Sequence, residues 1–294
     1  MQSYNSKTIS KGRDLKMQKR ILTVQDISCI GQCSLTVAMP IISAYGVETC
    51  ILPSAVLSTH TGGFKGQFTF RDLTDDFQGI IKHWEENDIR FDALYTGYIG
   101  NPKQFELINI IKEKLMADGA PVIIDPAMAD NGRLYTGFDT EFAAKMADFT
   151  CGADYVLSNI TEACFMLGME YKTEYSEDYI LEICRGLHKK GAKNAVITGV
   201  TFDPELLGIA YYEGETDTIS YHFEKRIPVS MHGTGDIFAS VFTGALMSGK
   251  SPLDAGIEAA RFVRSSILNT MDQPEHFYGA NFESVIAKKD TLLD

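Results

Sequence analysis

Residues 233–236, Gly-Thr-Gly-Asp, combine the residue types that could bind an anion beside an acid. Two glycines separated by one residue let the backbone approach a ligand closely, and the apolar run at 238–246 is typical of a buried helix. Unpaired N–H groups at a helix N-terminus bind anions, and Asp236 would lie in that first turn. This arrangement suits phosphoryl transfer, in which the amides stabilise charge on the transferred group and the carboxylate accepts a hydroxyl proton. The alternative is purely structural, because Asp and Gly are common where helices begin.

A second pair of candidates, Asn159 and Glu162, follows the apolar run at 155–157. Residues three apart share one face of a helix, so both side chains could point toward a phosphate that is bound to Mg²⁺. The same spacing fits a capping arrangement, in which Glu162 folds back on the start of the helix. The two roles can coexist.

Two further carboxylates, Asp125 and Asp130, come from one segment. Asp125 ends an apolar run, and Asp130 begins the turn-forming sequence Asp-Asn-Gly. Carboxylates at the carboxyl edge of a sheet suit coordination of a metal through water. A simple turn is the alternative for Asp130.

Two polar loops could hold a flat polar ring. Residues 58–64 contain His60 and Thr61 next to two glycines, and residues 96–98 contain Tyr98 after a later apolar run. Together they offer hydroxyl, imidazole and aromatic groups. A lone His is more often structural than catalytic, so His60 is given a supporting role only.

The elements that must position these residues alternate along the chain. Short β-branched runs are separated by amphipathic segments whose apolar residues recur at three- and four-residue steps. Apolar strands between helices predict a parallel sheet covered on both faces, and residues 208–224 predict an antiparallel hairpin at its edge. We expect one three-layer α/β/α domain with a mostly parallel central sheet, which binds ligands at the carboxyl ends of its strands. The predicted strands are 20–24, 49–52, 93–96, 122–125, 155–157, 195–198, 208–213 and 218–224, and the predicted helices are 75–87, 103–117, 176–189, 238–246 and 252–269.

The composition restricts the partners and the compartment. The chain has 294 residues and a formal charge of -12, with no Lys/Arg-rich run beyond its start, so we expect no nucleic-acid partner. The six cysteines lack zinc-ligand spacing and are expected to be free thiols of a cytoplasmic protein. No apolar stretch approaches the ~20 residues that span a bilayer, so we expect no membrane association. Residues 1–16 are polar and basic and are expected to be a disordered extension of one domain at 17–294.

Together and in this order, the four motifs resemble the ribokinase-like superfamily, and specifically its pyridoxal kinase branch. Residues 233–236 match the Gly-Thr-Gly-Asp segment of that family, and residues 159–162 match its Asn-x-x-Glu motif. Residues 125–130, Asp-Pro-Ala-Met-Ala-Asp, resemble its Asp-Pro-Val-Met-Gly-Asp segment. The loops at 58–62 and 96–98 resemble its Ser-x-His-Thr-Gly and Thr-Gly-Tyr motifs. The P-loop pattern Gly-x-x-x-x-Gly-Lys-Ser/Thr is absent.

The resemblance implies an ATP-dependent kinase that phosphorylates the 5′-hydroxymethyl group of pyridoxal and related B6 vitamers, producing pyridoxal 5′-phosphate. It also implies Mg²⁺, often K⁺ as an activator, no separate lid domain, and a homodimer with small-molecule ligands. The implied roles are catalysis by Asp236 as the base, with Gly233, Thr234 and Gly235 around the transferred phosphoryl group; vitamer binding by Asp26, His60, Thr61 and Tyr98; ATP binding by Asp125, Asn159, Thr198 and Thr234; and Mg²⁺ binding by Asp130 and Glu162.

Three positions differ from the pattern of that branch. Asp26 stands where a ring-contacting Ser is common, and an acid there is expected to prefer a protonated ring or an amine-bearing vitamer. Ala129 replaces a Gly of the metal loop, and Leu157 replaces the Thr that usually precedes the Asn-x-x-Glu motif. Neither of these two changes removes a charge that the chemistry requires.

Other functions stay open as alternatives. A hydroxymethylpyrimidine kinase would share the fold and the chemistry, but its usual opening Gly-Ser-Asp-x-Ser-Gly-Gly-Ala-Gly is absent from residues 26–37. A sugar or nucleoside kinase would carry a lid inserted early in the chain, where no such hairpin is predicted. A non-catalytic sensor of a nucleotide or vitamin on the same scaffold would be favoured by a missing base, whereas Asp236 is present.

Overall fold

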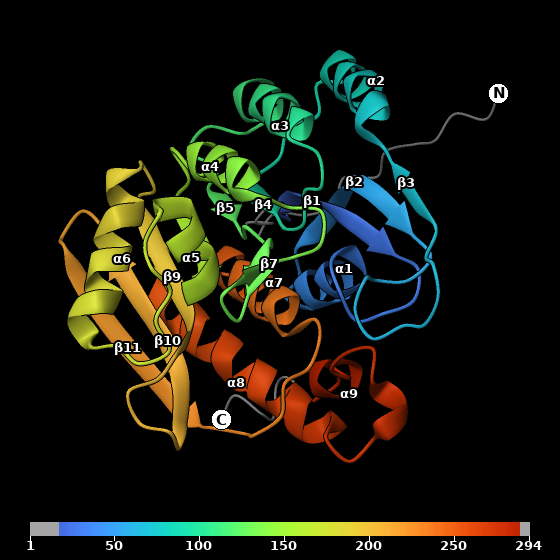
Figure 1. Ribbon diagram of the computed structural model, residues 1–294. Helices are drawn as coiled ribbons and strands as arrows, with labels where there is room; N and C mark the ends of the chain where they lie inside the picture. Colours follow the sequence, from blue (N-terminus) through green and yellow to red (C-terminus); the bar gives the residue numbers. More distant parts are fainter. Residues whose placement is uncertain (1–17, 289–294) are drawn as a thin grey trace, which may run out of the picture.

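The computed structural model describes residues 18–288, which form a central β-sheet between two layers of helices (Figure 1). The strands of the main sheet are separated by helices, as expected for an α/β fold. The main strands are β1 (Arg20–Ser28), β2 (Glu48–Leu57), β3 (Phe70–Asp72), β4 (Ala93–Thr96), β5 (Val122–Ile124), β8 (Tyr155–Asn159), β9 (Asn194–Val200), β10 (Leu206–Glu213) and β11 (Thr218–Lys225), and β6 (Ala129–Asp130) pairs with β7 (Arg133–Leu134) in a small separate hairpin. The helices are α1 (Leu35–Ala44), α2 (Thr74–Glu86), α3 (Lys103–Lys114), α4 (Thr140–Phe149), α5 (Ile160–Leu167), α6 (Glu177–Lys189), α7 (Thr234–Met247), α8 (Pro252–Thr270) and α9 (Glu283–Ile286), with a 3-10 turn at Pro274–His276.

The strand order of the main sheet is β11-β10-β9-β8-β5-β4-β1-β2-β3. The six strands from β9 to β2 run parallel, and β10, β11 and β3 pair antiparallel at the two edges. The predicted parallel sheet and the predicted edge hairpin are therefore confirmed. The chain leaves β1 toward β2 on one side and returns to β4 on the other, which creates the reversal in strand order where open α/β sheets bind ligands.

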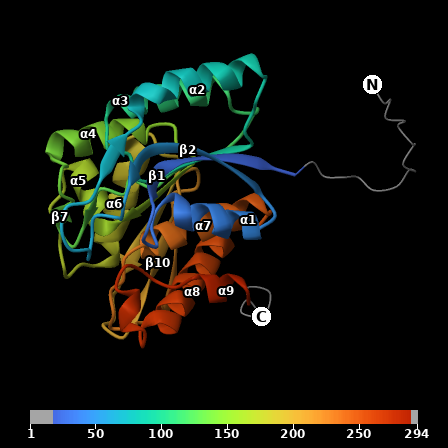
Figure 2. The same ribbon diagram turned by 90° about the vertical axis from the view of Figure 1, so that its right-hand side faces the viewer.

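The two faces of the sheet build two apolar cores, one under each layer of helices (Figure 2). Successive side chains of a strand point to opposite faces. Ile21, Tyr95 and Ile123 therefore pack on the layer of α1, α7 and α8, while Leu22 and Leu94 pack on the layer of α2 to α6. Odd-numbered residues of β1, β4 and β5 thus face α7, the helix that carries Asp236.

Several elements were not predicted from the sequence: α1, α4, α9, β3, the β6–β7 hairpin and the 3-10 turn. The helix α1 contains Pro40, which lacks a backbone N–H and argues against a helix interior. It forms nevertheless because its apolar face is buried, including Leu35 and Ile41. The predicted strand at 122–125 ends at Ile124, so Asp125 lies just beyond the ladder.

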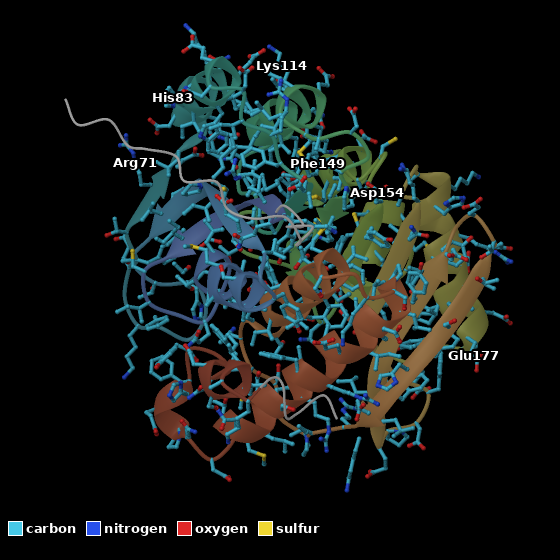
Figure 3. The ribbon with its side chains drawn as sticks, turned by 180° about the vertical axis from the view of Figure 1, so that it is seen from behind. Arg71, His83, Lys114, Phe149, Asp154 and Glu177 are labelled. Atoms are coloured by element: carbon cyan, nitrogen blue, oxygen red, sulfur yellow. The ribbon has the colours of Figure 1, made fainter. Side chains whose placement is uncertain are left out.

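At the amino edge of the sheet, Asp154 ties three strands together. Its carboxylate accepts the N–H of Val122 at 2.8 Å and pairs with Lys193 at 2.7 Å. Val122 begins β5 and Lys193 precedes β9, so one side chain bridges both neighbours of β8 (Asp154 is labelled in Figure 3). The contacts of Asp154 at this edge thus hold neighbouring strands together.

Among residues 18–288, no helix combines the length and the apolar character needed to cross a bilayer. The extension expected at residues 1–16 lies outside the described part of the chain.

Candidate active site

The predicted site residues gather at the carboxyl edge of the sheet. Asp26 lies near the end of β1, Tyr98 follows β4, Asp125 follows β5, and Asn159 is the last residue of β8. The negative charges of Asp125 and Asp26 both raise the pKa of Asp236, which places the first turn of α7 at the same edge. The topology thus brings together residues from four strands and one helix.

The glycine-rich turn before α7 has two glycines with different roles. Gly233 is the N-cap of α7 with a φ of 77°, and a Cβ there would lie 1.6 Å from the carbonyl oxygen of Gln32. Only glycine fits that conformation and that contact. A Cβ on Gly235 would meet nothing within 4 Å, so the space before it is open. The Thr234 hydroxyl donates to the Met231 carbonyl at 3.3 Å, and no side chain caps the helix, which leaves its first amides free for an anion.

Asp236 lies in the first turn of α7, as predicted, and its side chain is half-buried. Desolvation raises the pKa of this carboxyl well above its usual range, and the charges of Asp125 and Asp26 act in the same direction. A hydrogen bond from the backbone N–H of Ser34 opposes that rise in pKa. A carboxylate of raised pKa holds a proton more strongly, which is the property required of a general base.

Asp26 lies near the end of β1, opposite a β-bulge in β2. Gln25 pairs with Pro53 and Ile27 pairs with Val56, so the extra residue lies in β2 and Asp26 stands opposite it. Its side chain is buried, and the Ser28 hydroxyl donates to its Oδ2 at 2.9 Å. Burial raises the pKa of Tyr98 to about 12, and the charge of Asp26 contributes. Asp26 therefore shares one space with Tyr98 and with the first turn of α7.

Asn159 and Glu162 form a reciprocal cap at the start of α5. Asn159 Oδ1 accepts the N–H of Glu162 at 2.9 Å, and Glu162 Oε2 accepts the N–H of Asn159 at 2.9 Å. The other carboxylate oxygen accepts the N–H of Met128 at 3.2 Å. Burial raises the pKa of Glu162 to about 7, while these backbone hydrogen bonds act against the rise. The capping alternative is confirmed, and a role with metal remains a prediction.

Asp125 and Asp130 lie at the two ends of a loop that folds over α5. Asp125 is buried and accepts the N–H of Ala127 at 3.0 Å, whereas Asp130 is exposed and binds its neighbour Asn131. Burial raises the pKa of Asp125 well above its usual range, and the charge of Glu162 adds to this effect. The charge of Asp130 also acts on Glu162. These three carboxylates therefore belong to one electrostatic cluster.

The acidic cluster does not form a metal cage by itself. Within residues 18–288, no three His, Cys, Asp or Glu side chains lie close enough together to hold a metal ion. Mg²⁺ binds through only one or two carboxylates together with water and substrate phosphates. The oxygen donors of Asp130 and Glu162 fit that mode, with Glu162 acting through water because protein amides already bind both of its oxygens.

Both ring nitrogens of His60 are hydrogen-bonded to the backbone, one in its own loop and one at Tyr278. Its Nδ1 accepts the N–H of Gly62 at 3.1 Å, so its Nε2 carries the proton and donates to the Tyr278 carbonyl at 2.7 Å. Desolvation lowers its pKa, which favours this neutral form. Thr61 is exposed next to it. The structure therefore uses His60 to order the loop, and contact of His60 or Thr61 with a vitamer stays a prediction.

Thr198 lies on β9 directly opposite Asn159 in the parallel pairing of β8 and β9. It is half-buried near the carboxyl end of its strand. The position agrees with a contact to a nucleotide that lies across the ends of these strands, and the contact itself stays a prediction.

Two residues at this edge were missed in the sequence. Ser34 precedes α1 with a φ of 54°, a conformation that costs a non-glycine residue about 1–3 kcal/mol. Its backbone N–H bonds with Asp236 and its hydroxyl with Asp26, so it caps no helix. Burial raises the pKa of Tyr135, as do the charges of Glu162, Asp130, Asp125 and Asp236, so this ring lies among four carboxylates. A serine before an apolar run predicts an N-cap, but nothing local predicts either contact.

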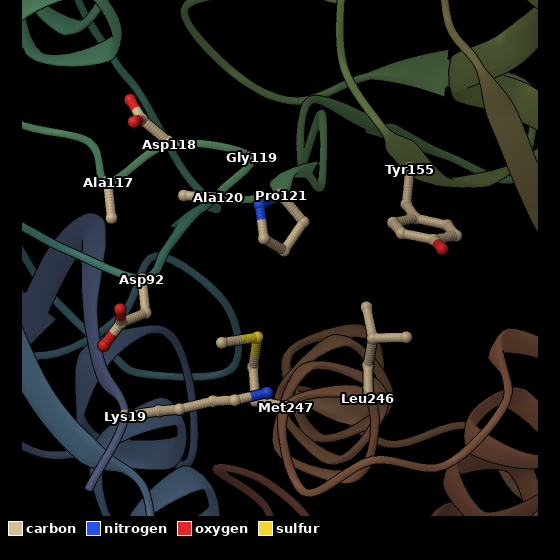
Figure 4. A pocket seen from close by; sticks show the side chains of 10 residues that line it. All are labelled: Lys19, Asp92, Ala117, Asp118, Gly119, Ala120, Pro121, Tyr155, Leu246 and Met247. Carbon is tan, nitrogen blue, oxygen red and sulfur yellow. The ribbon is translucent and has the colours of Figure 1, made fainter. Parts of the chain in front are cut away.

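A hollow of about 370 Å³ lies at the other edge of the sheet (Figure 4). Its wall includes Lys19, Asp92, Pro121 and Tyr155, which stand at or before the amino ends of strands. None of the predicted site residues lines it. The candidate chemistry therefore belongs to the carboxyl edge.

Residues 42–280 match the family model described as phosphomethylpyrimidine kinase. The chain is also 26% identical over 269 residues to the pyridoxal kinase of Dictyostelium discoideum, and the match covers 86% of each protein.

Two solved structures share the fold along nearly the whole chain. One is a Bacteroides thetaiotaomicron protein described as a candidate phosphomethylpyrimidine kinase, in a crystal form with pyridoxal. It has 35% sequence identity and a TM-score of 0.87, with coverage of 93% of this chain and 96% of that one. The other is pyridoxal kinase from Lactobacillus plantarum, with 27% identity, a TM-score of 0.83, and coverage of 92% and 95%. The three-layer α/β/α architecture is therefore common to all three proteins.

Proposed function

This chain belongs to the phosphomethylpyrimidine kinase family, and we propose that it transfers the γ-phosphoryl group of ATP to the 5′-hydroxymethyl group of pyridoxal and related B6 vitamers. The product would be pyridoxal 5′-phosphate. Its relatives named as pyridoxal kinases, and the related structure that contains pyridoxal, support this substrate class. The predicted membership of the ribokinase-like superfamily is confirmed.

One observation carries the proposal: a carboxyl group of raised pKa stands in the first turn of a helix whose first amides are uncapped. The amides of Gly233, Thr234 and Gly235 would stabilise negative charge on the transferred phosphoryl group. Asp236 would accept the proton of the attacking hydroxymethyl group as the oxygen bonds to phosphorus and ADP departs. No covalent enzyme intermediate is required.

Asp130 and Glu162 would hold Mg²⁺, the latter through water, and Asp125, Asn159 and Thr198 would line the nucleotide side of the site. The ion would supply positive charge to the triphosphate. The acidity of the cluster supports a cation here, because the charge of Glu162 raises the pKa of Asp125 and the charge of Asp130 raises the pKa of Glu162 in the absence of one. We further propose a cytoplasmic homodimer, and K⁺ as an activator.

Hydroxymethylpyrimidine kinase is the second candidate, because the matching family model carries the phosphomethylpyrimidine description. Both reactions phosphorylate a hydroxymethyl group on a nitrogen heteroaromatic ring, so the site chemistry supports either. A sensor without turnover is disfavoured by the positioned Asp236.

The test is an ADP-release assay with ATP and Mg²⁺ across pyridoxal, pyridoxine, pyridoxamine and 4-amino-5-hydroxymethyl-2-methylpyrimidine. We expect a higher kcat/KM for at least one B6 vitamer than for the pyrimidine. A higher kcat/KM for the pyrimidine would assign the second function. Absence of ADP release with all four compounds would refute both kinase assignments.

A further inference from the structure

Asp26 is a buried acid without a positively charged partner. Its side chain is 5% exposed, and none of the ion pairs among residues 18–288 includes it. Its hydrogen bonds come from the hydroxyl groups of Ser28 and Ser34 and from its own backbone N–H, all of which are neutral. Taking a carboxylate out of water is costly unless a cation or several donors compensate. Burial accordingly raises the pKa of Asp26.

The groups around Asp26 are themselves acids. Asp236 approaches from α7, and Tyr98 approaches from the end of β4. Among the described residues, none of the groups with the largest effects on the pKa of Asp26 or Asp236 is a Lys, Arg or His. The titratable groups that act on this pair or are acted on by it are Asp125 after β5, Cys33 before α1, Tyr95 on β4 and Tyr135 after β7.

We propose that Asp26 recognises positive charge on the acceptor substrate, by pairing its carboxylate with a cationic N–H group of the ring or of an aminomethyl substituent. This inference rests on the proposed function, because it assigns a specificity residue to that same site. Asp26 lies near the carboxyl end of β1, the strand at which the strand order reverses, and its charge acts on Asp236. A substrate whose hydroxymethyl group meets Asp236 would bring the rest of its ring close to Asp26.

Ser34 connects this recognition to the base. Its hydroxyl bonds with Asp26 while its backbone N–H bonds with Asp236, so one residue spans both carboxyl groups. The negative charge of Asp26 is one cause of the raised pKa of Asp236. A cation that pairs with Asp26 offsets that charge, and the pKa of Asp236 then falls. A positively charged substrate would thus favour the ionised base that its own phosphorylation needs.

The experiment compares the wild type with Asp26→Asn, which keeps the shape of the side chain and removes its charge. The substrates are pyridoxine, pyridoxamine, and an analogue of pyridoxine in which CH replaces the ring nitrogen. Asp92→Asn is the matched control, because it removes the same charge at the opposite edge, where Asp92 accepts the N–H of Arg20 at 2.7 Å (Figure 4). Asp92→Asn should leave substrate discrimination unchanged.

A lost hydrogen bond to a charged group corresponds to a fall in kcat/KM of about 10- to 100-fold. If the aminomethyl group is the partner, Asp26→Asn loses this factor with pyridoxamine alone. If the ring nitrogen is the partner, it loses the factor with both vitamers and not with the analogue. Equal losses with all three compounds, or no loss, would overturn the proposal.

Two further measurements keep this inference separate from the proposed function. Calorimetric binding of pyridoxamine and the analogue without nucleotide tests Asp26 even if no compound is phosphorylated. If Asp26→Asn fails to fold, the pH dependence of kcat of the wild type is measured with each of the three compounds instead. If the aminomethyl group pairs with Asp26, the acidic limb of the kcat profile lies at lower pH with pyridoxamine than with the analogue. If the ring nitrogen pairs with Asp26, the acidic limb lies at lower pH with both vitamers than with the analogue. Identical acidic limbs for all three compounds would contradict the coupling.

Discussion

Asn159 and Glu162 cap the same helix turn reciprocally, with both backbone-to-side-chain distances at 2.9 Å. The arrangement fixes two residues that we assign to nucleotide and Mg²⁺ binding before any ligand arrives. It also buries Glu162 to 3% exposure beside Asp125. The same two residues therefore form a structural cap and part of the proposed ligand site. Burial of the Glu162 carboxylate destabilises the ligand-free protein.

The contribution of Glu162 to the stability of the ligand-free protein should fall as pH rises. Glu162 has a pKa of about 7 in the folded state against an ordinary 4.5, so its stabilising contribution is complete below about 4.5 and is lost as pH rises through about 7. We expect Glu162→Gln to reduce the loss of unfolding free energy between about pH 5 and about pH 8 by roughly 1–3 kcal/mol.

Urea unfolding at both pH values measures this difference. Glu86→Gln is the control, because that side chain is 59% exposed in an ion pair with Lys82. A Glu162→Gln variant whose pH dependence equals that of the wild type would show that the burial of this carboxylate has no such consequence.

The two glycines of the 233–235 turn should separate stability from activity. Gly233→Ala would combine a positive φ with a contact of 1.6 Å, so we expect it to lose at least about 2 kcal/mol of unfolding free energy. Gly235→Ala should fold with a change of no more than about 1 kcal/mol. Its methyl group enters the open space before the helix, so kcat/KM for ATP should fall about tenfold or more.

Thermal or urea unfolding together with steady-state kinetics distinguishes the two variants. Normal ATP kinetics in Gly235→Ala would mean that the transferred phosphoryl group does not approach this turn.

His60→Ala should loosen the loop at 58–64 and affect catalysis only indirectly. Both ring nitrogens of His60 serve backbone groups, of Gly62 and Tyr278, and neither is free for proton transfer. We expect a higher KM for the vitamer with kcat within about threefold of the wild type, and faster proteolysis in this loop.

His83→Ala on α2 is the control, since His83 (labelled in Figure 3) is an exposed residue in the last turn of that helix. A fall in kcat of about 100-fold or more with unchanged KM would instead make His60 an acid–base catalyst.

The sequence predicted the fold well because its signals are local. The apolar runs of β4 and β8 and the amphipathic α6 and α8 lie within a few residues of their predicted bounds. The exceptions also have local causes. Pro40 lies inside α1 and argued against a helix there. The strands β6 and β7 have two residues each, which is too few to show any periodicity.

The candidate site was predictable only in part. Motifs identified Asp236, Asn159 and Glu162, and the topology brought them to one edge. The contacts of Ser34 with Asp26 and Asp236 join residues that are up to about two hundred positions apart, and they depend on a positive φ that no sequence rule assigns to serine. The fastening of His60 to Tyr278 is equally non-local.

The most direct test of the account is the turnover of pyridoxal with ATP and Mg²⁺ by Asp236→Asn. Asp76→Asn is the matched control, because Asp76 occupies the same position in the first turn of α2, outside the site. We predict that Asp236→Asn folds normally and loses about 10²- to 10⁴-fold in kcat, the range expected for a general base, while Asp76→Asn retains wild-type turnover. Retention of wild-type kcat by Asp236→Asn would contradict the assignment of Asp236 as the base.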